Sequence, residues 1–208
     1  MGAMARLVDR NAKREQIVAA AAGQFAKTGF AATLMDDVAT AACVSKGSLY
    51  DYFENKEDLF YAVFEWSQRQ VMLASLAEFK TGLTAKEQIL NFAEAAATAL
   101  VAQVELYPVT LEVWSAAATA DTRKRFAEAM RQLYAQFRGQ VEALLRAAQQ
   151  GGEIKPDTDT RAIASMLVGA VDGLMLQYWL DPNFDPKAWV RTFLCALFDG
   201  IAAGKTKE

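Results

Sequence analysis

The stretch that decides the fold is residues 45–60, SKGSLYDYFENKEDLF, which contains two helix starts. Ser45 and Asn55 are residue types that cap helix N-termini, and apolar residues follow each of them at helical spacing. Leu49 and Phe53 are four residues apart, so they share one face of the short helix between the caps. That face is predicted to be buried, which turns the polar side chains of the helix outward.

A longer helix and a second short helix are predicted to precede this stretch. Apolar residues recur every four positions within residues 11–27, and Gly29 suits the end of that helix. Thr33 follows as an N-cap residue with Asp36 at the third helical position, the spacing of a capping box for a helix over residues 34–42. Short helices joined by a tight turn at residues 43–44 are typical of a helix-turn-helix.

The helix after Ser45 is predicted to carry its polar face toward DNA. Phenol and hydroxyl groups on an exposed helix donate hydrogen bonds to phosphates and contact thymine methyl groups. Lys56 adds a cation beside backbone N–H groups at the next helix start, an arrangement that suits a phosphate. The alternative for Tyr50 and Tyr52 is packing between helices, but the complete polar set favours DNA. That set is Lys46, Gly47, Ser48, Tyr50, Asp51 and Tyr52.

Residues 10–60 resemble the N-terminal module of the TetR family of bacterial transcriptional repressors. The matching residues, in order and without gaps, are Gly29-Phe30, Thr33, Met35-Asp36-Asp37-Val38-Ala39, Ala42, Val44-Ser45-Lys46-Gly47, Leu49-Tyr50, Tyr52-Phe53 and Lys56-Glu57-Asp58-Leu59. The resemblance implies that Thr33 lies at the phosphate backbone and that Lys56 holds a phosphate. It also implies that the residues presented to the major groove and its phosphates are Lys46, Ser48, Tyr50, Asp51 and Tyr52.

Two residues depart from the pattern of the family. Cys43 stands where the family usually has glycine, and since a positive φ costs a non-glycine residue about 1 kcal/mol, the turn is expected to use ordinary backbone angles. Asp51 stands at a variable position and does not suit a phosphate. It is either an acceptor for a cytosine amino group or a solvated residue.

The composition argues against an enzyme. The 208 residues contain no histidine, which excludes Ser-His-Asp triads and imidazole metal ligands. The two cysteines lie far apart in apolar helical pattern, so that no disulfide framework is predicted and a reducing cytoplasm fits. We expect no catalytic residues, no metal and no cofactor.

The net charge does not indicate a nucleic-acid binder. It is −3 for the whole chain. Residues 5–27 carry five basic and two acidic side chains, whereas residues 28–58 carry two basic and six acidic ones. The charge count alone argues against DNA, so the prediction of DNA binding depends on geometry. The alternative hypothesis is a helical ligand-binding or interaction protein that no longer binds DNA.

The whole chain is predicted to be all-α. A three-helix helix-turn-helix DNA-binding domain is expected over residues 1–55, and a larger helical effector-binding and dimerisation domain over residues 56–208. Apolar periodicity and Gly or Pro punctuation predict helices at residues 56–79, 85–105, from Pro108 onward, 122–150, 160–180 and 186–203, with a loop over 152–159 that ends in N-cap residues. The apolar run at residues 163–180 is interrupted by Asp172 and Gln177, which favours a helix buried on all sides over a membrane span.

The last two predicted helices are apolar on nearly every side, which indicates a dimer interface. Glycines four residues apart let another helix approach closely. The alternative is burial inside a monomer, but the resemblance implies that the two helices pair with their copies in a four-helix interface. The candidate interface residues are Gly169, Asp172, Gly173, Leu176, Phe193 and Leu197.

The middle helices are rich in large apolar and aromatic residues, which is consistent with a ligand cavity. The candidate wall residues are Trp66 and Trp114, with polar contacts from Gln68, Tyr107 or Glu112. If Glu112 lies inside, a cation is favoured; if it lies outside, a neutral or anionic ligand fits equally. The alternative for each residue is ordinary bundle core.

These observations together predict a cytoplasmic, dimeric transcriptional regulator, most often a repressor in this family. Its partners are expected to be a pseudo-palindromic operator in double-stranded DNA and a small apolar or aromatic effector, with no membrane.

Overall fold

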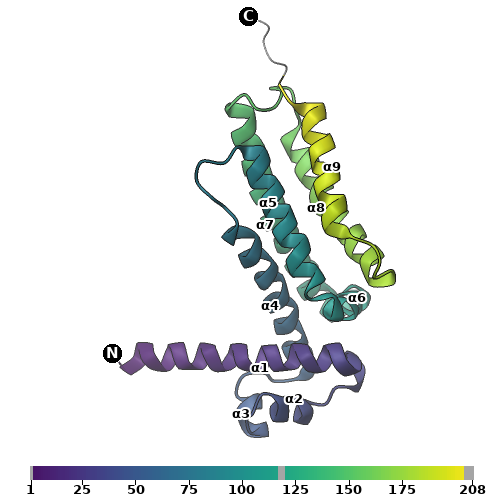
Figure 1. The fold of residues 1–208 in the computed structure, drawn as a ribbon. Coiled ribbons are helices and arrows are strands. Elements are labelled where there is room, and N and C mark those ends of the chain that lie inside the picture. The colour runs from purple at the N-terminus through teal and green to yellow at the C-terminus, as the bar shows by residue number, and fades with distance from the viewer. Residues whose placement is uncertain (1, 117–119, 204–208) are drawn as a thin grey trace, which may run out of the picture. The chain divides into compact units, whose positions relative to one another are not determined.

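The computed structural model describes residues 2–116 and 120–203, and it describes their side chains except at residues 2–8, 113, 114, 116 and 120–123. The regular elements of these residues are helices, as predicted, apart from one isolated bridge between Ile154 and Ala202. The helices are α1 (Gly2–Ala32), α2 (Met35–Ala41), α3 (Lys46–Tyr50), α4 (Lys56–Ala77), α5 (Ala85–Val101), η1 (Val104–Leu106), α6 (Tyr107–Ala116), α7 (Ala120–Gln150), α8 (Thr160–Leu180) and α9 (Pro186–Ile201) (Figure 1).

The chain forms two compact units. The first unit comprises Met1–Gln68 and Glu105–Ala129, and the second comprises Arg69–Val104 and Met130–Glu208. The units therefore do not follow the functional boundary that we predicted between residues 55 and 56, because α4 and α7 each begin in the first unit and end in the second. That boundary remains a prediction about function.

The core of the first unit follows the predicted apolar stripe of α1. Ile17, Ala21 and Phe25 are buried, and so are Leu49 and Phe53 around α3. Aromatic rings from α1 and α4 meet in one cluster: Phe25, Phe30 and Phe60 have ring centroids 4.4–5.8 Å apart. Aromatic contacts of this kind add to the burial of apolar area. The helix that carries the predicted DNA-contacting residues, α3, is therefore packed against a well-filled core.

Helix α1 is longer than predicted and is broken where a stop was predicted. It begins at Gly2 instead of Asn11, and Gly29 has non-helical angles, φ 78° and ψ 161°. A single short turn follows the break before α2. Only glycine adopts such angles at low cost, so the prediction that the first helix stops at Gly29 is confirmed.

The predicted cap of α2 is wrong by one residue. The N-cap is Leu34, whose N–H donates to Asp37 Oδ2 at 3.2 Å. Thr33 is instead buried, and its hydroxyl donates to the carbonyl of Gly29 at 2.7 Å. Thr33 takes part in closing the α1 break, and the acidic residue at the third helical position of α2 is therefore Asp37 and not Asp36.

Cys43 contradicts the expectation of ordinary backbone angles in the turn, because its φ is 53°. The hydrogen bonds explain why: Cys43 N–H donates to Thr40 O at 3.1 Å and Val44 N–H donates to Ala39 O at 2.9 Å. This pair of bonds is a Schellman ending for α2, which requires a left-handed residue after the C-cap. The hydrogen bonds of the turn outweigh the strain at Cys43.

We therefore expect Cys43→Gly to raise the free energy of unfolding by about 0.5–1 kcal/mol, because glycine adopts the left-handed conformation without strain. Chemical denaturation at fixed protein concentration measures this change. Cys43→Ala is the control and should give no comparable gain, since alanine keeps the strain. An equal gain in both variants would mean that the thiol, and not the backbone angle, is unfavourable at this position.

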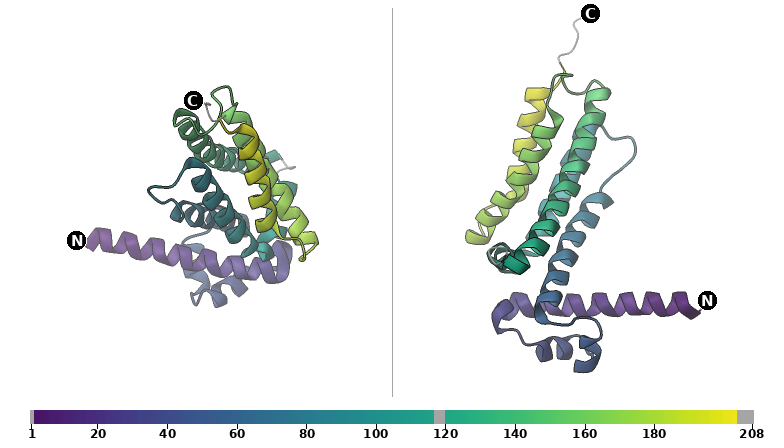
Figure 2. Two further views of the ribbon diagram at one scale, coloured as in Figure 1. Left: turned by 45° about the horizontal axis from the view of Figure 1, so that its top comes forward. Right: turned by 180° about the vertical axis from the view of Figure 1, so that it is seen from behind.

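In the second unit, α5, α8, α9 and the later part of α7 lie side by side around one apolar core (Figures 1 and 2). Ile89, Leu145 and Leu194 are among its fully buried residues. Two ion pairs join α5 to α9: Arg191 Nη1 lies 2.6 Å from Glu94 Oε1, and Lys86 Nζ lies 3.2 Å from Asp199 Oδ1. Exposed pairs of this kind contribute little energy, so the packing of the core holds the helices together.

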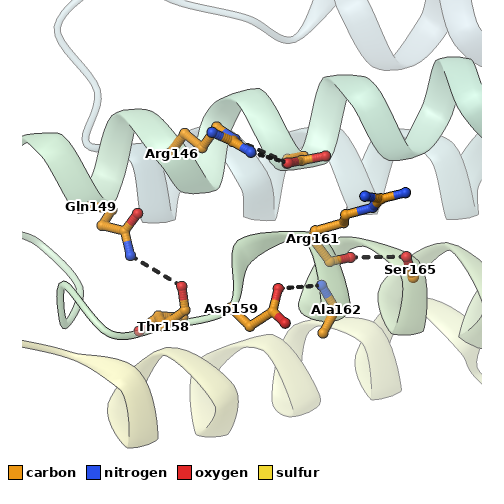
Figure 3. A network of polar contacts seen from close by, with 8 residues as sticks. Arg146, Gln149, Thr158, Asp159, Arg161, Ala162 and Ser165 are labelled. Atoms are coloured by element: carbon orange, nitrogen blue, oxygen red, sulfur yellow. Dashed lines mark hydrogen bonds and ion pairs between the residues drawn. The ribbon is translucent and has the colours of Figure 1, made fainter.

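The loop between α7 and α8 ends in a cap, as predicted. Gln149 Nε2 donates to the carbonyl of Pro156 at 2.9 Å. It also donates to the carbonyl of Thr158 at 3.1 Å, and Asp159 Oδ1 accepts from Ala162 N–H at 2.9 Å (Figure 3). The amide of Gln149 therefore orders the loop, and Asp159 starts α8.

Candidate nucleic-acid interface

Helix α3 has a buried side and a polar side, as its apolar spacing predicted. Ser45 Oγ accepts the Ser48 N–H at 3.1 Å and caps the helix, while Leu49 and Phe53 fix its buried side. The remaining residues of the predicted DNA-contacting set surround this anchor. Lys46, Gly47, Tyr50 and Asp51 are exposed, whereas Ser48 and Tyr52 are half-buried. The polar side therefore presents phenol, hydroxyl and ammonium groups from a short, firmly seated helix.

Lys46 is held by a carboxylate of α2. Its Nζ lies 2.7 Å from Asp36 Oδ1, and both side chains are 61% exposed. The hydrogen bond and the charge of Asp36 raise the pKa of the Lys46 ammonium. The amine is therefore charged at every physiological pH.

Lys56 has a different role from the predicted phosphate clamp. Its Nζ donates to the carbonyls of Phe30, Ala31 and Thr33 at 2.8, 3.0 and 3.0 Å. It also lies 4.5 Å from the centre of the Phe30 ring. An ammonium group has three N–H donors, and backbone carbonyls at the end of α1 occupy all three. No N–H donor is therefore left for a phosphate in this arrangement. The arrangement is favourable because the unpaired carbonyls at a helix end attract a cation.

Thr33 does not present its hydroxyl to a ligand either. The side chain is only 1% exposed, and its hydroxyl lies 2.7 Å from Thr28 Oγ1 as well as from Gly29 O. The contact with the phosphate backbone that the resemblance implied is therefore not available to this hydroxyl. Thr33 acts within the α1–α2 connection.

Two arginines of α1 lie beside the helix-turn-helix, and sequence reasoning gave them no role. Arg10 Cζ lies 5.7 Å from the centre of the Tyr52 ring, and Arg14 Cζ lies 5.1 Å from that of Phe53. The excess of basic residues in 5–27 was the only signal for them in the sequence. A guanidinium that stacks on an aromatic face keeps its N–H donors free at the ring edge. Arg10 and Arg14 therefore place positive charge beside the acidic segment of residues 28–58.

The predicted ligand-binding residues all belong to the first unit. Trp66 and Gln68 on α4 and Tyr107 and Glu112 on α6 are half-buried, while the side chain of Trp114 lies outside the described residues. Glu112 is the informative member of the set. Its Oε2 is buried and has no hydrogen-bond partner among the described residues. The burial of Oε2 places the end of the Glu112 side chain on the inside, where a carboxylate oxygen without a partner is costly.

The predicted dimer residues divide into two groups. Gly169, Gly173, Leu176 and Phe193 are exposed, whereas Asp172 and Leu197 are half-buried. Asp172 Oδ2 accepts a hydrogen bond from the Tyr134 hydroxyl at 2.5 Å, and burial raises the pKa of this carboxyl. Leu197 packs against the core of the second unit. These two residues therefore have partners within their own chain.

Helix α8 is not buried on all sides, which corrects the prediction for residues 163–180. Met166 and Leu180 are 75% and 68% exposed, and Trp189 and Phe193 of α9 are 58% and 54% exposed. Among the described residues, α8 (Thr160–Leu180) is the one single helix long and apolar enough to cross a membrane, a weak indication because helices of water-soluble proteins pass the same test. One side of α8 packs into the core of the second unit, and its other apolar side is left exposed in the single chain.

A three-helix head with a polar, firmly seated α3 defines the class of helix-turn-helix DNA-binding proteins. Comparison with known proteins identifies the family. Residues 17–63 match the family "Bacterial regulatory proteins, tetR family", and residues 85–203 match "BetI-type transcriptional repressor, C-terminal". The chain belongs to the tetR family. It is a DNA-binding transcriptional regulator and not an enzyme.

Individual relatives agree with this assignment. The "Fatty acid metabolism regulator protein" of Bacillus subtilis is 27% identical over 198 residues, which cover 91% of this chain and 95% of the relative. The "Probable acrEF/envCD operon repressor" of Escherichia coli is 24% identical and covers 80% of this chain and 76% of the relative. The solved structure of FadR from Bacillus subtilis in complex with stearoyl-CoA has a TM-score of 0.73 at 26% identity and covers 90% of this chain and 98% of that chain.

Proposed function

We propose that the chain is a dimeric, effector-responsive repressor that binds a pseudo-palindromic operator through the polar side of α3. The observation that carries this proposal is the anchoring of α3. Leu49 and Phe53 bury one side of the helix, and Ser45 caps it, so the other side is presented in a fixed orientation. Because chromosomal DNA lies in the bacterial cytoplasm, the protein acts there.

The residues proposed to contact DNA are sorted by their chemistry. Tyr50 is 44% exposed on α3, and Ser48 lies two residues before it on the other flank of the buried Leu49. The chemistry of these two side chains suits base edges and the thymine methyl group. Lys46, Arg10 and Arg14 suit phosphates, which carry no sequence information. Gly47 has no atom within 4 Å of the position that a Cβ would take, so a close approach of DNA to the backbone is possible there. Tyr52, stacked on Arg10, orients the guanidinium.

The outward apolar side of α8 and α9 supports a homodimer. Apart from the adjacent backbone of α8 itself, no atom lies within 4 Å of a Cβ added at Gly169 or Gly173. Exposed large apolar residues flank these open positions on α8 and α9: Met166, Leu176, Leu180, Trp189 and Phe193. Large apolar side chains exposed together on two helices that pack against each other mark an interaction surface. A symmetric dimer presents two copies of α3, so we expect its operator to be two-fold symmetric.

The proposed effector is a small molecule with a largely apolar body and a cationic group that donates a hydrogen bond to Glu112. The unpartnered, buried Oε2 of Glu112 supports this polar contact. The structure of the relative in complex with stearoyl-CoA supports a long acyl chain as the apolar body. An effector of this kind releases the operator only if it binds the DNA-free arrangement more tightly than the DNA-bound one.

The test is binding to the DNA segment that lies upstream of the protein's own gene. We expect wild type to bind it with a dissociation constant of about 10⁻⁸–10⁻¹¹ M and Tyr50→Ala to bind it roughly tenfold more weakly, because one base contact is worth about 1–3 kcal/mol. Fluorescence anisotropy measures both constants, and addition of stearoyl-CoA in the same assay tests for release by an acyl effector.

Gln136→Ala, an exposed position on α7, is the control and should bind like wild type. A wild-type protein that bound upstream and unrelated DNA equally weakly would support the alternative function, a helical ligand-binding protein whose head no longer binds DNA.

A further inference from the structure

The ion pair between Lys46 and Asp36 is a feature that operator recognition does not require. Lys46 is the only basic residue between Thr33 and Asn55, so it is the only ammonium that the helix-turn-helix itself can offer to a phosphate. Asp36 Oδ1 lies 2.7 Å from its Nζ, and Oδ2 accepts a hydrogen bond from it at 3.1 Å. The positive charge of the recognition helix is therefore paired before DNA arrives.

Asp36 does not supply the side-chain cap of α2. The neighbouring Asp37 supplies the cap contact to the Leu34 N–H, and the Asp36 side chain is 61% exposed. The side-chain contact of Asp36 in the described structure is the ammonium of Lys46. A pair this exposed is worth at most about 1 kcal/mol to stability. Its consequence lies in what Lys46 can do for DNA.

A lysine gains affinity for DNA by neutralising a phosphate and releasing a condensed counterion. Lys46 makes that contact only by giving up the carboxylate that already neutralises it. The carboxylate then remains at the surface and repels the phosphates that approach α3. Both effects are independent of the base sequence, because every sequence presents the same phosphates.

We propose that Asp36 competes with DNA phosphates for Lys46 and thereby weakens the binding of every DNA sequence. The proposal rests on the proposed contact of the α3 face with DNA. It makes Asp36 a residue that lowers the general affinity for DNA and leaves the preference for the operator unchanged. The genome offers a very large number of non-operator sites, so a weaker general affinity leaves more of the protein unbound to them.

The test compares Asp36→Asn with wild type on two duplexes of 30 base pairs, one from the upstream segment and one of unrelated sequence. We expect Asp36→Asn to bind both duplexes about tenfold more tightly at 50 mM salt, because the lysines of both heads become available. The salt slope should steepen by about two units per dimer, so that the gain nearly disappears by 200 mM salt. Asp36→Ala should behave in the same way and serves as a second variant.

Two controls isolate the ion pair from the change in charge. Glu54→Gln removes one negative charge from an exposed position of the same segment and should give a much smaller gain. Asp36→Asn in a Lys46→Gln background should give only the small gain expected of Glu54→Gln, because the lysine that Asp36 restrains is gone and only the repulsion of one carboxylate is removed. A tenfold gain that persists in the Lys46→Gln background, or that Glu54→Gln reproduces, would overturn the proposal.

The same experiment separates this inference from the proposed function. If wild type binds the upstream duplex but Asp36→Asn leaves both affinities and the salt slope unchanged, the inference fails alone. If wild type and Asp36→Asn bind neither duplex, the proposed function fails and takes the inference with it.

Discussion

Lys56→Ala is expected to lower the free energy of unfolding by about 2–3 kcal/mol, because three carbonyls lose a charged hydrogen-bond donor at once. The ammonium joins the first residue of α4 to Phe30, Ala31 and Thr33 at the end of α1. Water replaces part of this pairing, but the Phe30 ring under the ammonium limits its access. For a chain of this length the loss corresponds to a fall of roughly 4–12 °C in the melting temperature.

The same variant distinguishes a structural lysine from a phosphate ligand. Measured at a temperature where both proteins are folded, the salt slope of DNA binding should be the same for Lys56→Ala and wild type. Lys27→Ala, an exposed lysine of α1, controls for the loss of one charge and should change stability by less than about 0.5 kcal/mol. A salt slope lower by about one unit with unchanged stability would restore Lys56 as a phosphate clamp.

The role of Lys56 shows where prediction from the sequence ends. The caps at Ser45 and Asn55 were predicted because each bonds an N–H only three residues ahead. The partners of Lys56 lie 23–26 residues earlier in the chain, and only the folded structure brings them together. The local sequence around a lysine after an N-cap is equally compatible with a phosphate ligand and with a lysine that binds backbone carbonyls. It therefore could not distinguish these two roles.

The angles at Cys43 were mispredicted for a related reason. The sequence shows the cost of a left-handed residue without a glycine, but not the two backbone hydrogen bonds that compensate for it. The burial of Leu49 and Phe53 was predicted correctly because their spacing of four residues is itself a local signal. The pairing of Lys46 with Asp36 spans ten residues and two helices, so it was missed.

Gly173→Leu is expected to abolish dimers and to weaken operator binding by at least about 100-fold, because each head then binds its half-site without the other. Gly173 is exposed on α8, and an added Cβ there meets no atom within 4 Å. Leucine is also a better helix former than glycine by about 0.8–1 kcal/mol. The single chain should therefore fold at least as well as wild type, while its interface side is blocked.

Gly139→Leu is the matched control, since Gly139 is an exposed glycine on α7 with equally open space around an added Cβ. It should gain the same helix propensity and remain a dimer. Light scattering at micromolar concentration, together with anisotropy on the upstream duplex, measures both consequences. The expected pair of results is a monomeric Gly173→Leu that binds unrelated DNA weakly and the operator hardly better, beside a dimeric Gly139→Leu with wild-type affinity.

A dimeric Gly173→Leu would place the interface elsewhere and leave the exposed Met166, Trp189 and Phe193 without an explanation. A monomeric wild type with full operator affinity would remove the requirement for two heads altogether, since the affinity would then come from one α3 alone.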